Sequence, residues 1–240
     1  MDFNEKDYEK LSIIDKLVFK ELIAKCKACK DGDKCQQNSY GMQPIIGKVE
    51  ESYMIFYTPC KFKRGHYHSY IDIKSYKNIY KNSNRNHIID ELIKGNGGFI
   101  YGRAGHGKSY TMGYIANMLN KKGHDVYFDL ANNIVQQVWK FETRDSKLKE
   151  LQEVEYLFID DFGGEKISSD IIYICWTPII KSRIDNNKPT YFTSNYSLRE
   201  LAVKLGKVSD MTTAQVLLDR IKVKGSYEFK DKDYRMGENV

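Results

Sequence analysis

The feature that most constrains this chain is the octapeptide Gly102-Arg103-Ala104-Gly105-His106-Gly107-Lys108-Ser109. A glycine, four residues and then Gly-Lys-Ser is the spacing of a phosphate-binding loop, or P-loop. Glycines allow the tight turn that points backbone N–H groups at phosphate oxygens. The lysine reaches the β- and γ-phosphates, and the serine hydroxyl binds Mg²⁺. The motif therefore predicts a site for a nucleoside triphosphate.

The sequence around the loop supports this interpretation over a chance match of a glycine-rich segment. Residues 99–101 form a short apolar run that predicts a buried strand leading into the loop. Residues 108–120 predict a helix, because Met112, Ile115 and Leu119 recur on one face. The amino end of such a helix places partial positive charge beside the phosphates.

Two further strand ends carry polar residues suited to ATP hydrolysis. The apolar run at 156–159 ends in Asp160 and Asp161, as a central parallel strand would. We expect Asp160 to hold Mg²⁺ through water and Asp161 to act as the general base toward the attacking water. Residues 189–194 predict another strand, and Asn195 after it can orient that water or merely cap the strand.

Length and composition limit the alternatives. With 240 residues, the chain can form one sizeable domain and a small one. The net charge of +6 is compatible with contacts to nucleic acid and equally with a lysine-rich surface. No apolar run is long enough to span a bilayer, and the polar amino terminus lacks the pattern of a signal peptide. We therefore expect a cytoplasmic protein with reduced cysteines and no membrane contact.

Four of the five cysteines lie close together near the amino terminus. Cys26 and Cys29 have the Cys-x-x-Cys spacing that allows two thiolates to share one metal ion, and Cys35 and Cys60 complete a four-cysteine zinc site. The alternatives are a redox pair of Cys26 and Cys29 alone, or His66 or His68 as a substitute ligand. We prefer zinc, because the region lacks the βαβ pattern of thioredoxin-like proteins.

These features divide the chain into three parts. Residues 1–62 form a small zinc-binding α+β domain, in which 5–25 predict an amphipathic helix that serves the core or a partner, and 49–58 predict a strand. Residues 63–86 are a linker rich in Lys, Tyr, Asn and His. Residues 87–240 are the ATPase domain, with a helix over 169–185 interrupted at Pro178 and a helical pattern over 198–224.

Taken together, these motifs resemble the AAA+ ATPases of the DnaC/DnaI helicase-loader family over nearly the whole chain. Residues 159–165, Ile-Asp-Asp-Phe-Gly-Gly-Glu, resemble the family's Asp-Asp-x-Gly-x-Glu signature. Residues 188–195 resemble its sensor-1 strand, and residues 218–221, Leu-Asp-Arg-Ile, resemble its arginine-finger helix. The cysteine cluster favours the DnaI branch, whose amino-terminal domain binds zinc and docks on the replicative helicase.

The resemblance implies a fold and a set of roles. The fold is an α/β P-loop core with a parallel sheet flanked by helices. Asn195 is sensor 1, Arg220 acts on the ATP of a neighbouring subunit, and Arg235 is a sensor-2 candidate. Nucleotide contacts come from the eight residues of the loop and from Tyr110, and the cofactors are ATP, Mg²⁺ and Zn²⁺. Glu165 matches the signature without a chemical role that we can assign. Some relatives have a histidine in the zinc window, so the four-cysteine set is our own inference.

The implied function is ATP-dependent loading of a hexameric DnaB-type replicative helicase onto single-stranded DNA, by subunits that associate through shared ATP. Lys166, Ser168 and Ser169 are candidates for backbone contact with that DNA. One alternative is an IstB-like helper of transposition, which the cysteine cluster disfavours. A zinc-containing adaptor that uses nucleotide as a structural switch is a second alternative, and a small-molecule kinase is a third.

Overall fold

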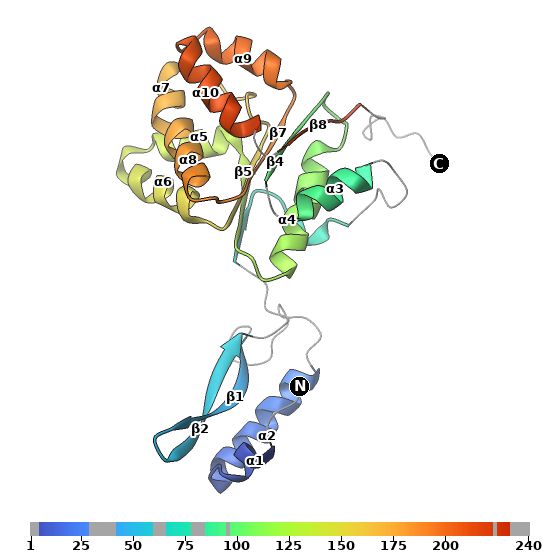
Figure 1. Cartoon of the computed structure of the whole chain (residues 1–240), viewed down its shortest axis with the longest axis vertical. Coiled ribbons are helices and arrows are strands. Elements are labelled where there is room, and N and C mark those ends of the chain that lie inside the picture. The colour runs from blue at the N-terminus through green and yellow to red at the C-terminus, as the bar shows by residue number, and fades with distance from the viewer. Residues whose placement is uncertain are drawn as a thin grey trace. The chain divides into compact units, whose positions relative to one another are not determined.

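The computed structural model describes residues 5–28, 42–59, 66–77, 85–94, 97–222 and 225–230 (Figure 1). The chain divides into two compact units. The first comprises Met1–Gly65 with Lys121–Gly123, and the second comprises His66–Asn120 with His124–Val240. Along the described stretches, no helix is both long and apolar enough to cross a lipid bilayer.

The first unit packs a helix against a two-stranded antiparallel sheet. Helices α1 (Glu5–Glu9) and α2 (Ile13–Ala28) precede strands β1 (Met42–Val49) and β2 (Ser52–Pro59), which pair along their whole length. The single helix predicted over 5–25 is divided into α1 and α2 at residues 10–12, the predicted strand corresponds to β2, and β1 is a strand that the sequence analysis did not identify. The first turn of α2 is closed by the Ser12 hydroxyl, which accepts a hydrogen bond from the backbone N–H of Asp15 at 3.1 Å.

The face of α2 that is buried differs from the apolar stripe seen in the sequence. The small core consists of Leu11, Phe19 and Ile23, packed against side chains of the hairpin. Ile14 and Leu17, which follow Leu11 at helical spacing in the sequence, are 74% and 66% exposed. The helix has apolar side chains on two faces, and the aromatic ring of Phe19 provides the larger surface to bury. Periodicity alone could not select between the two faces.

The second unit is built on one six-stranded parallel sheet, as predicted. Its strands are β3 (Tyr67–Ser69), β4 (Gly98–Tyr101), β5 (Val126–Leu130), β6 (Tyr156–Asp160), β7 (Thr190–Ser194) and β8 (Ser226–Glu228). They lie in the order β3-β5-β6-β7-β4-β8. The P-loop strand β4 therefore lies next to β7, and β7 lies next to the acidic strand β6. All three carboxyl ends meet at one edge of the sheet.

Helices cover both faces of this sheet (Figure 1). Helices α3 (Arg85–Ile93) and α4 (Lys108–Lys121) lie on one face. The other face carries α5 (Ala131–Trp139), α6 (Arg144–Glu153), α8 (Thr177–Asp185), α9 (Leu198–Gly206) and α10 (Met211–Lys222). Short helical segments, η2 (Ile73–Ser75), η3 (Phe141–Thr143) and α7 (Ser169–Ile171), lie between the longer elements.

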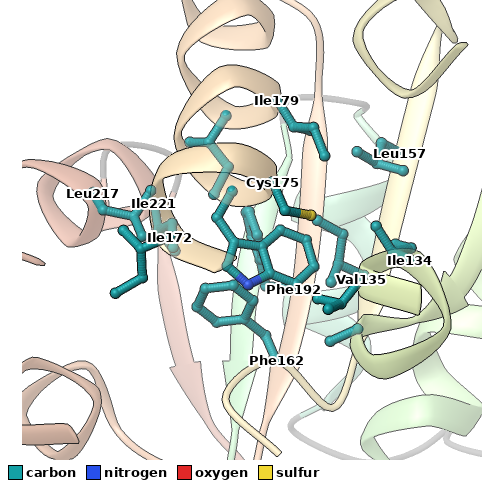
Figure 2. Packing of buried hydrophobic residues seen from close by; sticks show 14 of the residues in the cluster. Ile134, Val135, Leu157, Phe162, Ile172, Cys175, Ile179, Phe192, Leu217 and Ile221 are labelled. Atoms are coloured by element: carbon teal, nitrogen blue, oxygen red, sulfur yellow. The ribbon is translucent and has the colours of Figure 1, made fainter. Parts of the chain in front are cut away.

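Alternation along the strands produces two cores. In β6, Leu157 and Ile159 point into the core on the α5 and α8 side, whereas Phe158 points into the core on the α4 side. Figure 2 shows the first core, where Cys175 and Ile179 face Leu157 and Phe192 of the sheet. Side chains of β6 are thus buried on both faces of the sheet, which explains the continuous apolar run that precedes Asp160.

Three expectations about segments need correction. Residues 66–77, assigned to the linker, belong to the second unit: β3 pairs with β5, and Ile73 is completely buried. The pattern over 198–224 contains two helices, α9 and α10, separated at residues 207–210. The interruption expected at Pro178 takes the form of a π-helical stretch, η4 (Ile172–Trp176), and Pro178 lies in the first turn of α8, where its missing N–H is not needed.

Candidate functional site

The P-loop connects β4 directly to α4. Gly102, Gly105 and Gly107 have φ values of 145°, 86° and 78°, in the region that favours glycine. Gly102 is the most constrained of the three, because a Cβ atom there would lie 2.3 Å from the carbonyl oxygen of Phe229. The first glycine of the motif is therefore needed for close backbone packing as well as for the turn.

Neighbouring segments hold the loop in place. The Nδ1 atom of His106 lies 2.8 Å from the carbonyl oxygen of Phe229, which follows β8. Arg85, the first residue of α3, donates from Nη1 to the carbonyl oxygen of His106 at 2.7 Å, and its guanidinium lies 4.2 Å from the centre of the Phe229 ring. The backbone N–H of Gly102 donates to the carbonyl oxygen of Ser194 at 3.2 Å. The phosphate-binding backbone is thus preorganised by three separate segments.

The Lys108 ammonium group lies at the centre of the site. It donates to the carbonyl oxygens of Gly102 at 2.7 Å and Arg103 at 2.9 Å, and to Oδ1 of Asn195 at 2.8 Å. The residue is only 7% exposed. Phosphate oxygens, which carry more charge than these acceptors, would be favoured partners for a buried ammonium group.

Asp160, at the carboxyl end of β6, is surrounded by hydroxyl groups. Its Oδ1 accepts from the Ser109 hydroxyl at 2.9 Å and from the Thr193 hydroxyl, and its Oδ2 accepts from the Tyr70 hydroxyl. A serine hydroxyl beside a buried carboxylate is a hard oxygen donor set, which fits Mg²⁺. Burial and the neighbouring charge of Asp160 raise the pKa of Tyr70, so its phenol remains a hydrogen-bond donor.

Asp161 and Asn195 form the second half of the site. The backbone of Asp161 has a φ of 56°, and its N–H donates to the Thr193 hydroxyl at 2.9 Å. The Nδ2 atom of Asn195 donates to Oδ1 of Asp161 at 2.7 Å. Burial, followed by the charge of Asp160, raises the pKa of Asp161, which makes this carboxylate a stronger proton acceptor.

The loop after Asp161 is fixed by Glu165, for which the sequence had suggested no role. Its buried carboxylate accepts from the backbone N–H of Gly163 at 2.7 Å and from Nε1 of Trp176 at 2.9 Å. The Lys204 ammonium group donates to the carbonyl oxygen of Gly163. Burial raises the pKa of Glu165. Through these hydrogen bonds, Glu165 links the turn after Asp161 to the π-helical segment η4.

Lys108, Asp160 and Asp161 line one cleft of about 450 Å³. The residues that it brings together from the sequence analysis are Ala104, Gly105, Gly107, Lys108, Ser109, Tyr110, Asp160, Asp161 and Asn195. A second hollow, of about 750 Å³, adjoins the same loop and is lined by Gly102, Arg103 and His106, and also by Asn195. The eight P-loop residues are therefore divided between two hollows that share Asn195.

Other residues singled out in the sequence lie elsewhere. Arg220 is half-buried on α10 and lines neither hollow. Lys166 is exposed, and the Ser168 hydroxyl accepts from the backbone N–H of Ile171 at the start of α7, which Ser169 begins. His68 is exposed and contacts Asp129 in the second unit, with its Nε2 3.4 Å from Oδ2.

The expected zinc ligands cannot be compared with the structure. Cys29, Cys35 and Cys60 lie outside the described residues, as does Arg235, and Cys26 is described only as part of the backbone of α2. Within the described ranges, no group of three or more His, Cys, Asp or Glu side chains could hold a metal ion. The four-cysteine zinc site remains a prediction.

Sequence reasoning missed three residues that shape the site. Thr193 precedes Asn195 by two positions, and the alternation of β7 was the available signal that it points into the cleft. Arg85 and Tyr70 had no such signal, because one begins a helix far from the motifs and the other lay in the expected linker. Only the tertiary contacts bring them to the P-loop and to Asp160.

Comparison with known proteins gives related sequences and structures. No family model matches the chain. The replicative helicase loader DnaI of Bacillus subtilis (strain 168) is 29% identical over 115 residues, which cover 47% of this chain. The match spans only 37% of the length of that protein.

Solved structures resemble the chain more extensively. A crystal structure of DnaI aligns with a TM-score of 0.61 at 22% identity, covering 71% of this chain and 96% of that one. The DnaC helicase loader aligns with a TM-score of 0.51 at 24% identity, covering 66% and 95%. DnaA from Aquifex aeolicus, bound to AMPPCP, aligns with a TM-score of 0.53 at 21% identity, covering 65% and 50%. The likeness shows a shared α/β fold.

Proposed function

We propose that this chain is an ATP-hydrolysing loader of a hexameric, DnaB-type replicative helicase, acting at the start of DNA replication. One observation carries the enzymatic part: Lys108, Ser109, Asp160, Asp161 and Asn195 converge on a single cleft. The sequence similarity to DnaI, together with folds shared with DnaI and DnaC, supports the choice of helicase loading among the roles of such ATPases.

The cleft provides groups for the phosphates, the metal ion and the attacking water. The P-loop backbone and Lys108 bind the phosphates, and Mg²⁺ held by Ser109 and Asp160 would neutralise developing charge on them. Asp161 accepts the proton of the attacking water. Asn195 contacts both Lys108 and Asp161, so it can hold that water in line with the γ-phosphate.

Self-association through ATP completes the site in this proposal. Arg220 lies outside the cleft of its own chain, as expected for an arginine finger that reaches the ATP of a neighbouring subunit. Arg235 is proposed as a weaker sensor-2 contact. Hydrolysis by the isolated chain should then be slow and should rise on assembly.

The first unit is the proposed grip on the helicase. On α2, the side chains of Ile13, Ile14 and Leu17 are 80%, 74% and 66% exposed. On the hairpin, Ile45 and Phe56 are paired across the strands and are also exposed. Exposed apolar side chains gathered in a small unit are typical of surfaces that bind protein partners. Zinc bound by Cys26, Cys29, Cys35 and Cys60 would stabilise this unit.

Single-stranded DNA is the proposed nucleic-acid partner. The net charge of +6 favours contact with a phosphate backbone, and Lys166, Ser168 and Ser169 follow the acidic motif closely enough to report DNA binding to the cleft. In the sequence, Glu165 lies between the acidic motif and Lys166. Its carboxylate accepts from the backbone N–H of Gly163, in the turn after Asp161.

Native mass spectrometry of the chain mixed with the replicative helicase of its own host tests the proposal. We expect several copies of the chain per hexamer, with and without ATP, and loss of the complex when zinc is chelated. Leu17→Ala should weaken the complex, whereas Glu51→Ala, at an exposed polar position in the turn between β1 and β2, should not. If no complex forms with folded, zinc-loaded protein and duplex DNA is bound instead, the transposition-helper interpretation replaces this one.

A further inference from the structure

Tyr70 is a side chain that contacts Asp160 from outside the recognised motifs. It follows β3 (Tyr67–Ser69), and its backbone N–H donates to the carbonyl oxygen of Phe128 in β5 at 3.1 Å. Its ring packs edge-on against that of Phe128, with 5.3 Å between ring centres. These contacts aim the phenol at the carboxyl edge of the sheet, where its hydroxyl donates to Oδ2 of Asp160.

The hydrogen bonds of Asp160 show which of its oxygens a metal-bound water would use. Oδ1 accepts two hydroxyl groups, those of Ser109 and Thr193. Each carboxylate oxygen offers about two lone-pair sites, so Oδ1 is fully used. Oδ2 accepts the Tyr70 hydroxyl, so water around a magnesium ion held beside Ser109 would share this oxygen with Tyr70.

The phenol also belongs to the lining of the cleft. Tyr70 lines the same cleft as Ser109, Lys108 and Asp160, so its hydroxyl is on the cleft side of the carboxylate. Mg²⁺ keeps several waters and requires near-ideal octahedral geometry. A phenol that holds one lone-pair site of Oδ2 draws negative charge from this oxygen and would weaken the hydrogen bond from a magnesium-bound water to the same atom.

We propose that Tyr70 is a positioning residue that competes with magnesium-bound water for Oδ2 of Asp160 and thereby weakens the binding of Mg²⁺ in the cleft. This inference rests on the proposed function, since it concerns the magnesium of the same ATP site. The Tyr70 hydroxyl acts on the carboxylate of Asp160, so its effect should fall on the metal rather than on the phosphates.

Tyr70 follows an edge strand of the sheet. β3 has three residues and pairs with one neighbour, β5. The first unit of the chain includes Gly65, shortly before Tyr70 in the sequence. The hydrogen bond to Asp160 is thus made by the segment that directly follows the proposed partner-binding unit.

A magnesium titration separates this competition from nucleotide binding. The full-length chain is saturated with a fluorescent ADP (mant-ADP) in EDTA, and Mg²⁺ is then titrated while the fluorescence is recorded. Tyr70→Phe should lower the Mg²⁺ midpoint on the order of tenfold, as expected for removal of one hydrogen bond to a charged group. The affinity for mant-ADP in EDTA should change less than about twofold, because Tyr70 acts through the metal.

The matched control is Tyr156→Phe, at the opposite end of the strand that carries Asp160. Both tyrosines are partly buried and pack against the same core, and Tyr156 does not line the cleft. Its Mg²⁺ midpoint should equal that of the unchanged chain. Tyr70→Leu removes the ring together with the hydroxyl and should shift the midpoint in the same direction, so the test does not depend on the folding of a single variant.

Two outcomes would overturn the inference, and they are distinguishable. An unchanged or raised Mg²⁺ midpoint in both Tyr70 variants, with normal binding by the unchanged chain, means that the hydroxyl orients Asp160 for the metal instead of competing with it. Absence of mant-ADP binding by the unchanged chain under every condition would instead remove the proposed ATP site, and this inference with it.

Discussion

The side-chain amide of Asn195 donates from Nδ2 to Oδ1 of Asp161 over 2.7 Å. The amide oxygen of the same residue accepts from the Lys108 ammonium group at 2.8 Å. One planar group therefore connects the lysine that is proposed to bind phosphate with the carboxylate that is proposed to accept a proton. Because an amide is rigid and uncharged, its orientation depends on both partners, and it can sense whether a γ-phosphate has taken the place of one of them.

Replacing Asn195 by Ala should reduce the rate of hydrolysis while nucleotide binding persists. Loss of a group that orients the water and its base should lower kcat on the order of 10- to 100-fold. Release of phosphate measured under single-turnover conditions, beside mant-ATP binding, gives both quantities. Equal losses in binding and rate would mean that Asn195 supports the loop as a strand cap and has no sensing role. Ser182→Ala is the control, because Ser182 lies on α8 outside the cleft. This variant should bind and hydrolyse nucleotide like the unchanged chain.

Glu165 should make stability depend on pH in a defined direction. Burial raises its pKa in the folded chain, so the folded state binds more protons than the unfolded state between the ordinary and the raised pKa. The contribution of Glu165 to the free energy of unfolding should therefore fall as the pH rises through that interval. Glu165→Gln, which stays neutral, should show a flatter dependence in urea unfolding measured across this range. Asp161 shifts in the same direction, so some slope should remain.

The control for this experiment is an exposed carboxyl. Glu142→Gln changes a side chain in η3 that is exposed, and its pH dependence should match that of the unchanged chain. A slope that is identical in all three proteins would show that ionisation of Glu165 costs no stability. In that case, the hydrogen bonds from Gly163 and Trp176 would fully offset the cost of burying the charged Glu165 carboxylate.

The trans role of Arg220 predicts complementation between two inactive variants. Lys108→Ala should lack a functional ATP site but retain its finger, whereas Arg220→Ala should bind ATP but lack the finger. Mixed in equal amounts, they should recover measurable hydrolysis, because a finger contributes on the order of 10³-fold or more to the rate. Each variant alone is measured in parallel. A mixture no more active than its components would assign Arg220 to its own subunit or to packing on α10.

Zinc should be bound by the first unit and not by the buried cysteine of the second. Native mass spectrometry should show one zinc ion per chain, lost in Cys29→Ala and Cys60→Ala. Cys175→Ala is the matched control, because Cys175 is buried in the core of the second unit, where desolvation raises its pKa and keeps it a thiol. Retention of zinc in the first two variants would disprove the four-cysteine site.

The sequence by itself determined the second unit's class and most of its cleft. The P-loop, the acidic strand end and Asn195 converge on one cleft as expected, because their positions depend on local backbone geometry and on strand ends, which their spacing in the sequence reveals. Parallel strands bring their carboxyl ends to one edge whatever the details of packing. The apolar run at 156–159 could also be recognised as a strand, because a strand buried on both faces must be apolar throughout.

Only the tertiary structure decided what lies between these motifs. Arg183 is fully buried on α8, where its guanidinium donates to backbone carbonyls that include those of Leu151, Val154 and Pro189, and no sequence pattern marks an arginine for that position. In the sequence, Tyr70 belongs to a stretch that was assigned to a linker. In the structure, β3 pairs with β5, and this pairing places the Tyr70 hydroxyl at Asp160. Such roles arise from contacts between distant segments, whose choice depends on shape and burial throughout the fold and leaves no local periodicity in the chain.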